Sequence, residues 1–165
     1  MRIVHPSRAR RYVAVFGTSL TLSITAILAT PRAAHAWDGS APGEIYNAAT
    51  WQCLDSDAAG DVYTAPCDGS NHQVWQYTSD GNLQDAQTGL CLTDYYYGPF
   101  TAQCENGLLK EDWTYSTAVV PAALRIFTGS GEFCLDAYMP DSSSIGYVYD
   151  SACEGRASED WYVFY

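Results

Sequence analysis

The sequence predicts an all-β domain with pseudo-threefold symmetry. One block occurs three times: Cys-Leu, strand-forming residues, a second Cys, and then Trp with Gln or Glu two positions before it. Units repeated at a spacing of about 40 residues pack against one another and bury a shared core. The region is rich in Tyr, Thr, Val and Trp and lacks the apolar spacing of a long helix. The copies run from Cys53 to Trp75, from Cys91 to Trp113 and from Cys134 to Trp161.

Each copy carries the signals of about four short strands. Residues 45–55 align without gaps on residues 83–93, whereas the third copy is looser in this part. Another strand-like stretch precedes each second Cys, and a Gly-containing turn such as Asp68-Gly69 follows it. Only residues 118–124 could form a helix, and a proline interrupts them.

All six Cys residues lie inside the repeats, two in each copy. The repeat selects one bridge per copy, and each bridge should stabilise the fold by about 3 kcal/mol. Zinc binding and nucleophilic chemistry are disfavoured, because the spacings lack the closely paired Cys residues of zinc sites. We therefore expect no metal and no cofactor. The predicted bridges are Cys53–Cys67, Cys91–Cys104 and Cys134–Cys153.

The Trp that ends each copy is predicted to lie in the core. A residue repeated with the symmetry of the fold fills the symmetric centre, where a large ring supplies much of the buried apolar area. The Gln or Glu two positions earlier would then satisfy nearby backbone groups. These residues are Trp75, Trp113 and Trp161, with Gln73, Glu111 and Glu159.

Residues 1–36 are predicted to be a secretory signal peptide. Four Arg residues precede an apolar run over residues 12–29, and Ala34-His35-Ala36 supplies the small-x-small pattern that a signal peptidase cleaves. An uncleaved membrane anchor is the alternative, since the run approaches the length of a spanning helix. The Arg10-Arg11 pair hints at twin-arginine export, but general secretion suits six pairing Cys residues better. We expect a secreted, extracellular protein with a short segment at residues 37–43 and one domain at residues 44–165.

Charge argues against several partners. From Trp37 onward the chain has three basic and nineteen acidic residues, a net charge of −16. Such a surface repels phosphate backbones and anionic lipids. We therefore expect no nucleic-acid binding and, once the leader is removed, no membrane binding, and we favour neutral ligands over anionic ones. The charge also keeps an extracellular protein soluble.

The three copies of Cys-Leu, second Cys and Gln-x-Trp resemble the ricin B-chain type of carbohydrate-binding domain, a β-trefoil found in lectins and attached to secreted glycoside hydrolases. The resemblance covers about residues 44–165 and is specific because it is threefold. Only Gln73-Val74-Trp75 keeps the Gln, and the other copies have Glu-Asp-Trp. It implies a β-trefoil that binds carbohydrate without altering it, although the function of such a fold depends on which sites are retained.

The resemblance places the sugar-binding carboxylate at Asp55 and Asp136, whereas the second copy has Thr93. A carboxylate can accept two protons from adjacent sugar hydroxyls. Alternatively, both Asp residues only cap turns. The polar residue before Gln-x-Trp is His72, which could donate a hydrogen bond to a sugar or be an ordinary surface His. Its counterparts are Lys110 and Ser158.

The stacking ring of such sites, two residues before the second Cys, is missing from all three copies. Tyr63 and Tyr149, four residues before that Cys, point to the same face of the strand and are candidate replacements, as is Phe100 in the second copy. Their threefold repetition also fits core packing. The missing-ring positions hold Ala65, Ala102 and Ser151. Further candidate rings in loops are Tyr95, Tyr96, Tyr97, Tyr138 and Tyr147.

Two other classes of function compete with sugar binding. Catalysis is disfavoured because residues 37–165 contain one His, no nucleophile motif and no carboxylate pair that stands out. A protein-binding or inhibitory β-trefoil without sugar sites is the alternative, with another secreted protein as partner. Its contact loops would be residues 95–98 and 141–144.

Overall fold

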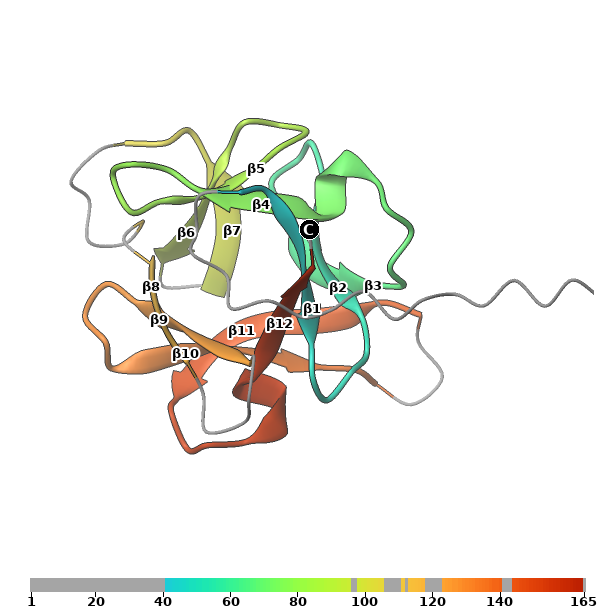
Figure 1. The fold of residues 1–165 in the computed structure, drawn as a ribbon, viewed down its shortest axis with the longest axis vertical. Helices are drawn as coiled ribbons and strands as arrows, with labels where there is room; N and C mark the ends of the chain where they lie inside the picture. The colour runs from blue at the N-terminus through green and yellow to red at the C-terminus, as the bar shows by residue number, and fades with distance from the viewer. Residues whose placement is uncertain are drawn as a thin grey trace, which may run out of the picture. The chain divides into compact units, whose positions relative to one another are not determined.

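The computed structural model describes residues 41–95, 98–105, 111, 113–117, 123–140 and 144–164. These residues form twelve β-strands and two short 3-10 turns (Figure 1). The predicted signal peptide lies outside them, as do residues 37–40 and most of the one stretch with helical potential, whose last residue, Leu124, begins a strand. No helix in the described part of the chain is long and apolar enough to cross a membrane.

The strands fall into three groups of four that match the sequence copies. The first group is β1 (Gly43–Asn47), β2 (Cys53–Ser56), β3 (Val62–Ala65) and β4 (Val74–Tyr77). The second is β5 (Leu83–Asp85), β6 (Cys91–Tyr95), β7 (Gly98–Ala102) and β8 (Trp113–Thr117). The third is β9 (Leu124–Thr128), β10 (Phe133–Tyr138), β11 (Gly146–Ala152) and β12 (Trp161–Phe164). The 3-10 turns η1 (Asn71–Gln73) and η2 (Ala157–Glu159) lead into β4 and β12.

All strand pairs are antiparallel, and the second and third strands of each group form a hairpin. The first strand, β1, pairs with β2 and β4 of its own group and also with the last strand, β12. Figure 1 shows β1 and β12 side by side. Strand β4 pairs with β5 of the second group, so the three groups share one sheet.

The core repeats the same contact three times. Each of the three Trp residues is buried, and its indole Nε1 donates a hydrogen bond to the carbonyl of the Leu that follows the first Cys of its copy. A buried indole N–H needs such a partner, so the bond fixes each ring against its hairpin. The predicted core role of the Trp residues is confirmed. The bonds are Trp75 to Leu54 (2.9 Å), Trp113 to Leu92 (2.8 Å) and Trp161 to Leu135 (2.9 Å).

Three disulfides form with the predicted pairing, one in each group: Cys53–Cys67, Cys91–Cys104 and Cys134–Cys153. Each ties the start of the second strand to the segment after the third. Every Cys is bonded, so none is available as a nucleophile or metal ligand.

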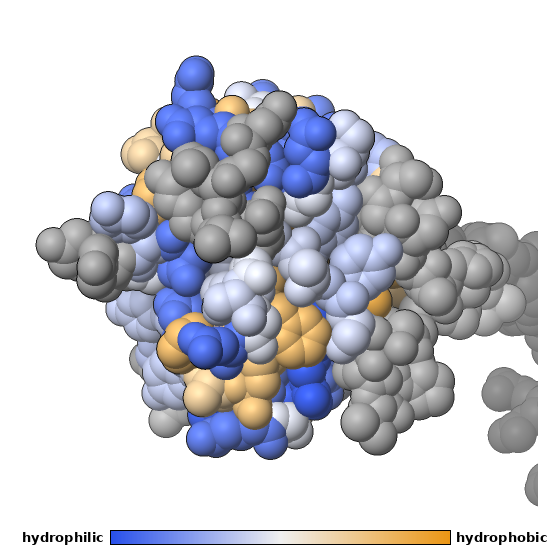
Figure 2. Space-filling view, turned by 90° about the vertical axis from the view of Figure 1, so that its left-hand side faces the viewer, coloured by the Kyte–Doolittle hydropathy of each residue, from blue (hydrophilic) through white to orange (hydrophobic). Residues whose placement is uncertain are grey.

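The surface is not uniformly polar. On the face shown in Figure 2, hydrophilic residues border a patch of hydrophobic ones. Large apolar side chains at least a third exposed occur at several strand ends and turns. They include Trp51, Tyr95, Phe133, Tyr138 and Tyr147.

Candidate functional site

Strand register brings the predicted site residues together. In the β2–β3 hairpin Asp55 lies opposite Tyr63, and in the β10–β11 hairpin Asp136 lies opposite Tyr149. Directly opposed side chains in an antiparallel pair are neighbours on one face of the sheet. The Tyr four residues before the second Cys therefore lies beside the carboxylate, half-buried, rather than in the core.

In the first repeat Asp55 is held by groups from two other elements, β3 and η1. The residue is 8% exposed, and its Oδ2 accepts a hydrogen bond from Gln73 Nε2 at 2.9 Å. Gln73 also donates to the Pro66 carbonyl and accepts from the Asp68 amide. Burial raises the pKa of Asp55, while the Gln73 amide, the nearby imidazole and the Tyr63 hydroxyl oppose the rise. The result is a fixed acceptor beside a phenol.

His72 completes this group. It lies on η1 directly before Gln73, close enough to Asp55 to lower its pKa by charge. The buried Nδ1 of His72 has no hydrogen-bond partner among the described residues. The ring also lines a pocket of about 410 Å³ with Ala58 and with Gln87, Thr88 and Leu90 of the β5–β6 turn. A buried polar atom without a partner is uncommon in a folded protein.

The second repeat lacks this arrangement. Thr93 is buried, and its hydroxyl donates to the backbone carbonyl of Cys91 at 3.2 Å. Phe100, opposite Thr93, offers no hydroxyl. The residue before the motif, Lys110, lies outside the described residues, as do Tyr96 and Tyr97. This geometry is consistent with the prediction that the second repeat has no carboxylate site.

In the third repeat, Asp136 is less accessible than expected. It is 0% exposed, and its Oδ2 accepts hydrogen bonds from Ser151 Oγ and from Arg156 Nη2, both at 2.9 Å. The other oxygen, Oδ1, has no partner among the described residues. Burial and the charge of Asp136 raise the pKa of Tyr149. A ligand would meet Tyr149 and Arg156 before Asp136.

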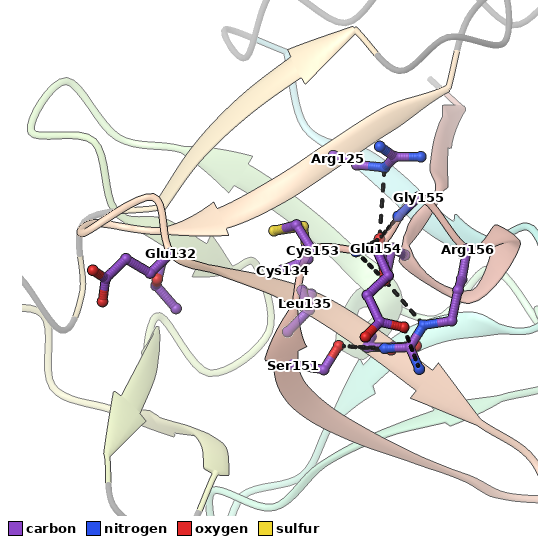
Figure 3. The surroundings of a disulfide bond; sticks show 12 residues. Arg125, Glu132, Cys134, Leu135, Ser151, Cys153, Glu154, Gly155 and Arg156 are labelled. Atoms are coloured by element: carbon purple, nitrogen blue, oxygen red, sulfur yellow. Dashed lines mark hydrogen bonds and ion pairs between the residues drawn. A yellow bond between two sulfur atoms is a disulfide. The ribbon is translucent and has the colours of Figure 1, made fainter.

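Arg156 explains why this copy has Glu159 where the first has Gln73. Two adjacent carboxylates cannot hydrogen-bond each other, so Arg156 bridges them, with Nε on Glu159 at 3.0 Å and Nη2 on Asp136. In Figure 3 its guanidinium points toward Ser151 and Glu154 beside the Cys134–Cys153 disulfide. Sequence reasoning missed Arg156. Its position directly after the Glu154-Gly155 turn, in a chain with so few basic residues, was the available signal.

The Gln and Glu side chains of the three motifs also cap the turns before them, as predicted. Gln73, Glu111 and Glu159 accept hydrogen bonds from the backbone amides of Asp68 (2.9 Å), Glu105 (2.6 Å) and Glu154 (3.0 Å).

The family model of the ricin-type β-trefoil lectin domain matches residues 41–161. The chain belongs to this family. None of the curated proteins matches the sequence.

Solved structures share the fold of this ricin-type domain at low identity. The hemolytic lectin CEL-III has a TM-score of 0.65 at 19% identity, over 75% of this chain and 30% of that one. The designed 3-fold symmetric protein ThreeFoil has a TM-score of 0.65 at 17% identity, and the match covers 78% of this chain and 99% of that one. The earthworm R-type lectin C-half, solved in complex with GalNAc, has a TM-score of 0.63 at 14% identity, and the match covers 74% of this chain and 97% of that one. The chain thus spans less than a third of CEL-III.

The described part of this ricin-type domain holds no group of three His, Cys, Asp or Glu side chains placed to bind a metal ion.

The remaining candidate rings among the described residues are exposed. Tyr138 and Tyr147 face each other across the end of the β10–β11 hairpin, at 57% and 66% exposure, and Tyr95 lies at the end of β6. Neither of the two pockets described for this part of the chain is lined by any of the three.

Removing Arg156 tests the third-repeat bridge of the ricin-type domain. Burial alone would raise the pKa of Glu159, but the amides of Glu154 and Gly155 and the Arg156 guanidinium outweigh it and lower that pKa. The folded-state value is therefore below the unfolded one, so the stabilisation is present above the unfolded pKa and is lost as pH falls through the folded pKa. Arg156→Met should lower the free energy of unfolding most at neutral pH, and less in acid, by urea titration.

Adding Glu159→Gln to Arg156→Met supplies an amide that can donate to Asp136, as Gln73 does to Asp55. This second change should restore part of the lost stability at neutral pH. An equal loss at all pH values, or no rescue by Gln, would show that the bridge is not what holds Asp136.

Proposed function

We propose that this protein is a secreted, non-catalytic lectin that binds neutral sugars at shallow sites in the first and third repeats. Membership of the ricin-type lectin family supports carbohydrate binding in general. The N-terminal charge and hydrophobicity pattern supports secretion. The observation that carries the proposal is the grouping of Asp55, Tyr63 and His72 in the first repeat.

This grouping suits a sugar because it combines hydrogen-bonding groups with a ring. The Asp55 carboxylate accepts hydroxyl protons, and its orientation is set by Gln73. The imidazole of His72 carries a buried Nδ1 that has no hydrogen-bond partner among the described residues. The half-buried Tyr63 presents a ring beside Asp55, where the apolar face of a pyranose can lie.

In the third repeat the same roles fall to Asp136 and Tyr149, with Arg156 as an added donor. The bridge to Arg156 and Ser151 occupies Asp136 Oδ2. A sugar there competes with internal hydrogen bonds, so we rank this site second. The excess of acidic residues favours neutral over anionic sugars at the first site.

The test is a glycan and polysaccharide binding screen of residues 37–165, oxidised, with Asp55→Asn and Asp136→Asn as variants. Losing one charge-assisted hydrogen bond should weaken binding of the best glycan about 10- to 100-fold. We expect that loss in Asp55→Asn and a smaller one in Asp136→Asn. Asp80→Asn, a change in an exposed turn, is the matched control. Binding that none of these changes affects would contradict the proposed sites.

A second candidate function is protein binding. The exposed pair Tyr138 and Tyr147, with Met139 and Ile145 nearby in sequence and also exposed, favours it. Exposed aromatic and apolar side chains on one hairpin end are typical of a contact with another protein. Absence of binding to any glycan by the folded protein would favour this function, with the hairpin end as its contact surface.

A further inference from the structure

Trp51 is the most exposed large apolar side chain described, at 73%, and its backbone is unusual. Its φ is 59°, in the left-handed region that bulky residues rarely adopt. The gap-free alignment of the first two copies places Gly89 at the same position, with a φ of 70°. The first repeat therefore carries an exposed indole where the second uses glycine.

The turn itself does not need Trp51. Asn47 Oδ1 accepts the amides of Ala49 and Thr50, and the Trp51 amide donates to the Asn47 carbonyl at 3.0 Å. The second repeat builds the same turn with Asp85, whose carbonyl accepts from Gly89 at 2.9 Å. Strain that a fold does not require points to a functional reason for the residue.

Trp51 belongs to a cluster of aromatic rings on the pair formed by the first and last strands. Its ring centroid is 5.7 Å from that of Tyr46, which is 5.5 Å from Tyr162 and 5.5 Å from Phe164. Tyr46 lies opposite Tyr162 in the β1–β12 register, so these rings share one face of the sheet. The four rings line an open pocket of about 460 Å³ together with Ala48, Ala157 and Asp160.

The polar part of this pocket favours a neutral occupant. Asp160 Oδ1 is paired with Arg125 Nε at 3.0 Å, so its charge is already compensated within the protein. Asp160 is 7% exposed but lines the pocket, and the side-chain hydrogen bond found for it among the described residues uses Oδ1, which leaves Oδ2 to accept a hydroxyl proton. A cation would need an uncompensated carboxylate or rings that enclose it. Tilted rings spread along two strands instead present a surface for a flat, hydroxylated ligand.

We propose that Trp51, Tyr46, Tyr162 and Phe164 form a separate saccharide-binding surface, which takes the apolar face of a neutral pyranose on its rings and a sugar hydroxyl on Asp160. It lies outside the three Asp or Thr positions of the repeats and uses a turn residue that the other copies do not share. The inference rests on the proposed function, because it assigns the same class of ligand. It gives the domain a second kind of contact with carbohydrate.

The test is an NMR titration of residues 37–165 with cellohexaose and xylohexaose, and with tetramethylammonium chloride as the cation probe. The Trp51 indole signal reports on this surface, and the His72 ring signals report on the Asp55 site. We expect an oligosaccharide to shift the Trp51 signal and tetramethylammonium to leave it unchanged. Trp51→Gly, which installs the residue of the second repeat, should weaken oligosaccharide binding about tenfold without loss of stability. Phe133→Ala, at an exposed ring outside the pocket, should not.

The outcomes separate the two proposals. Loss of binding in Trp51→Gly with full binding in Asp55→Asn supports the aromatic surface and contradicts the first-repeat site. The reverse pattern overturns the aromatic surface and leaves the proposed function standing. A Trp51 signal moved only by tetramethylammonium overturns the saccharide assignment, and no shift at either site with either oligosaccharide overturns both.

Discussion

Replacing Trp75 by Ala is expected to lower the free energy of unfolding by about 3–5 kcal/mol, the range for losing a large buried ring. Trp75 is buried in the shared core, and its indole Nε1 donates to the Leu54 carbonyl at 2.9 Å. The variant loses the apolar burial and leaves that carbonyl without its donor. Urea unfolding followed by far-ultraviolet circular dichroism measures the loss.

Two variants separate the parts of this effect. Trp75→Phe keeps a ring but removes the N–H donor, so its loss should be smaller. Trp51→Ala removes an exposed indole and should cost little, because the side chain is not packed in the core. Equal losses in Trp75→Ala and Trp51→Ala would contradict the core role of the repeated Trp.

Removing the Cys134–Cys153 disulfide by changing both residues to Ala should lower the free energy of unfolding by about 3 kcal/mol. The bridge closes the longest loop of the three, with a sequence separation of 19 against 14 and 13. Loop-closure entropy grows slowly with length, so the other two removals should cost only a few tenths of a kcal/mol less.

The three double-Ala variants can be compared by urea unfolding under oxidising conditions, with the other two disulfides intact. Because each bridge lies within one repeat, we expect each variant to keep the fold with a lower midpoint. A loss confined to one variant would show that the chain entropy of the loops does not set the contribution of the bridges.

The threefold fold and its disulfides could be predicted from the sequence because their determinants are local. Each Cys pair closes its own hairpin, and each Trp reaches the Leu of its own copy. That Asp55 and Tyr63 are neighbours could also be predicted, since spacing along the two strands of a hairpin sets their register.

Contacts made by residues far apart in the chain could not be read in this way. Arg156 reaches Asp136 from the turn before η2, and nothing in strand periodicity reveals that bridge. The cluster around Trp51 depends on pairing between the first and last strands and on a left-handed backbone at a Trp, which propensity argues against. Both features lie where the copies differ, and a shared motif predicts only what the copies have in common.

Pairing of β1 with β12 has a consequence for the order in which the protein can fold. Glu44, near the start of β1, lies opposite Phe164, near the end of the chain. The hairpins and their disulfides can form as each repeat emerges, but the first strand lacks this partner until β12 has been made. Completion of the fold therefore waits for synthesis of β12. A chain cut short before β12 would expose the unpaired edge of its first strand to other chains.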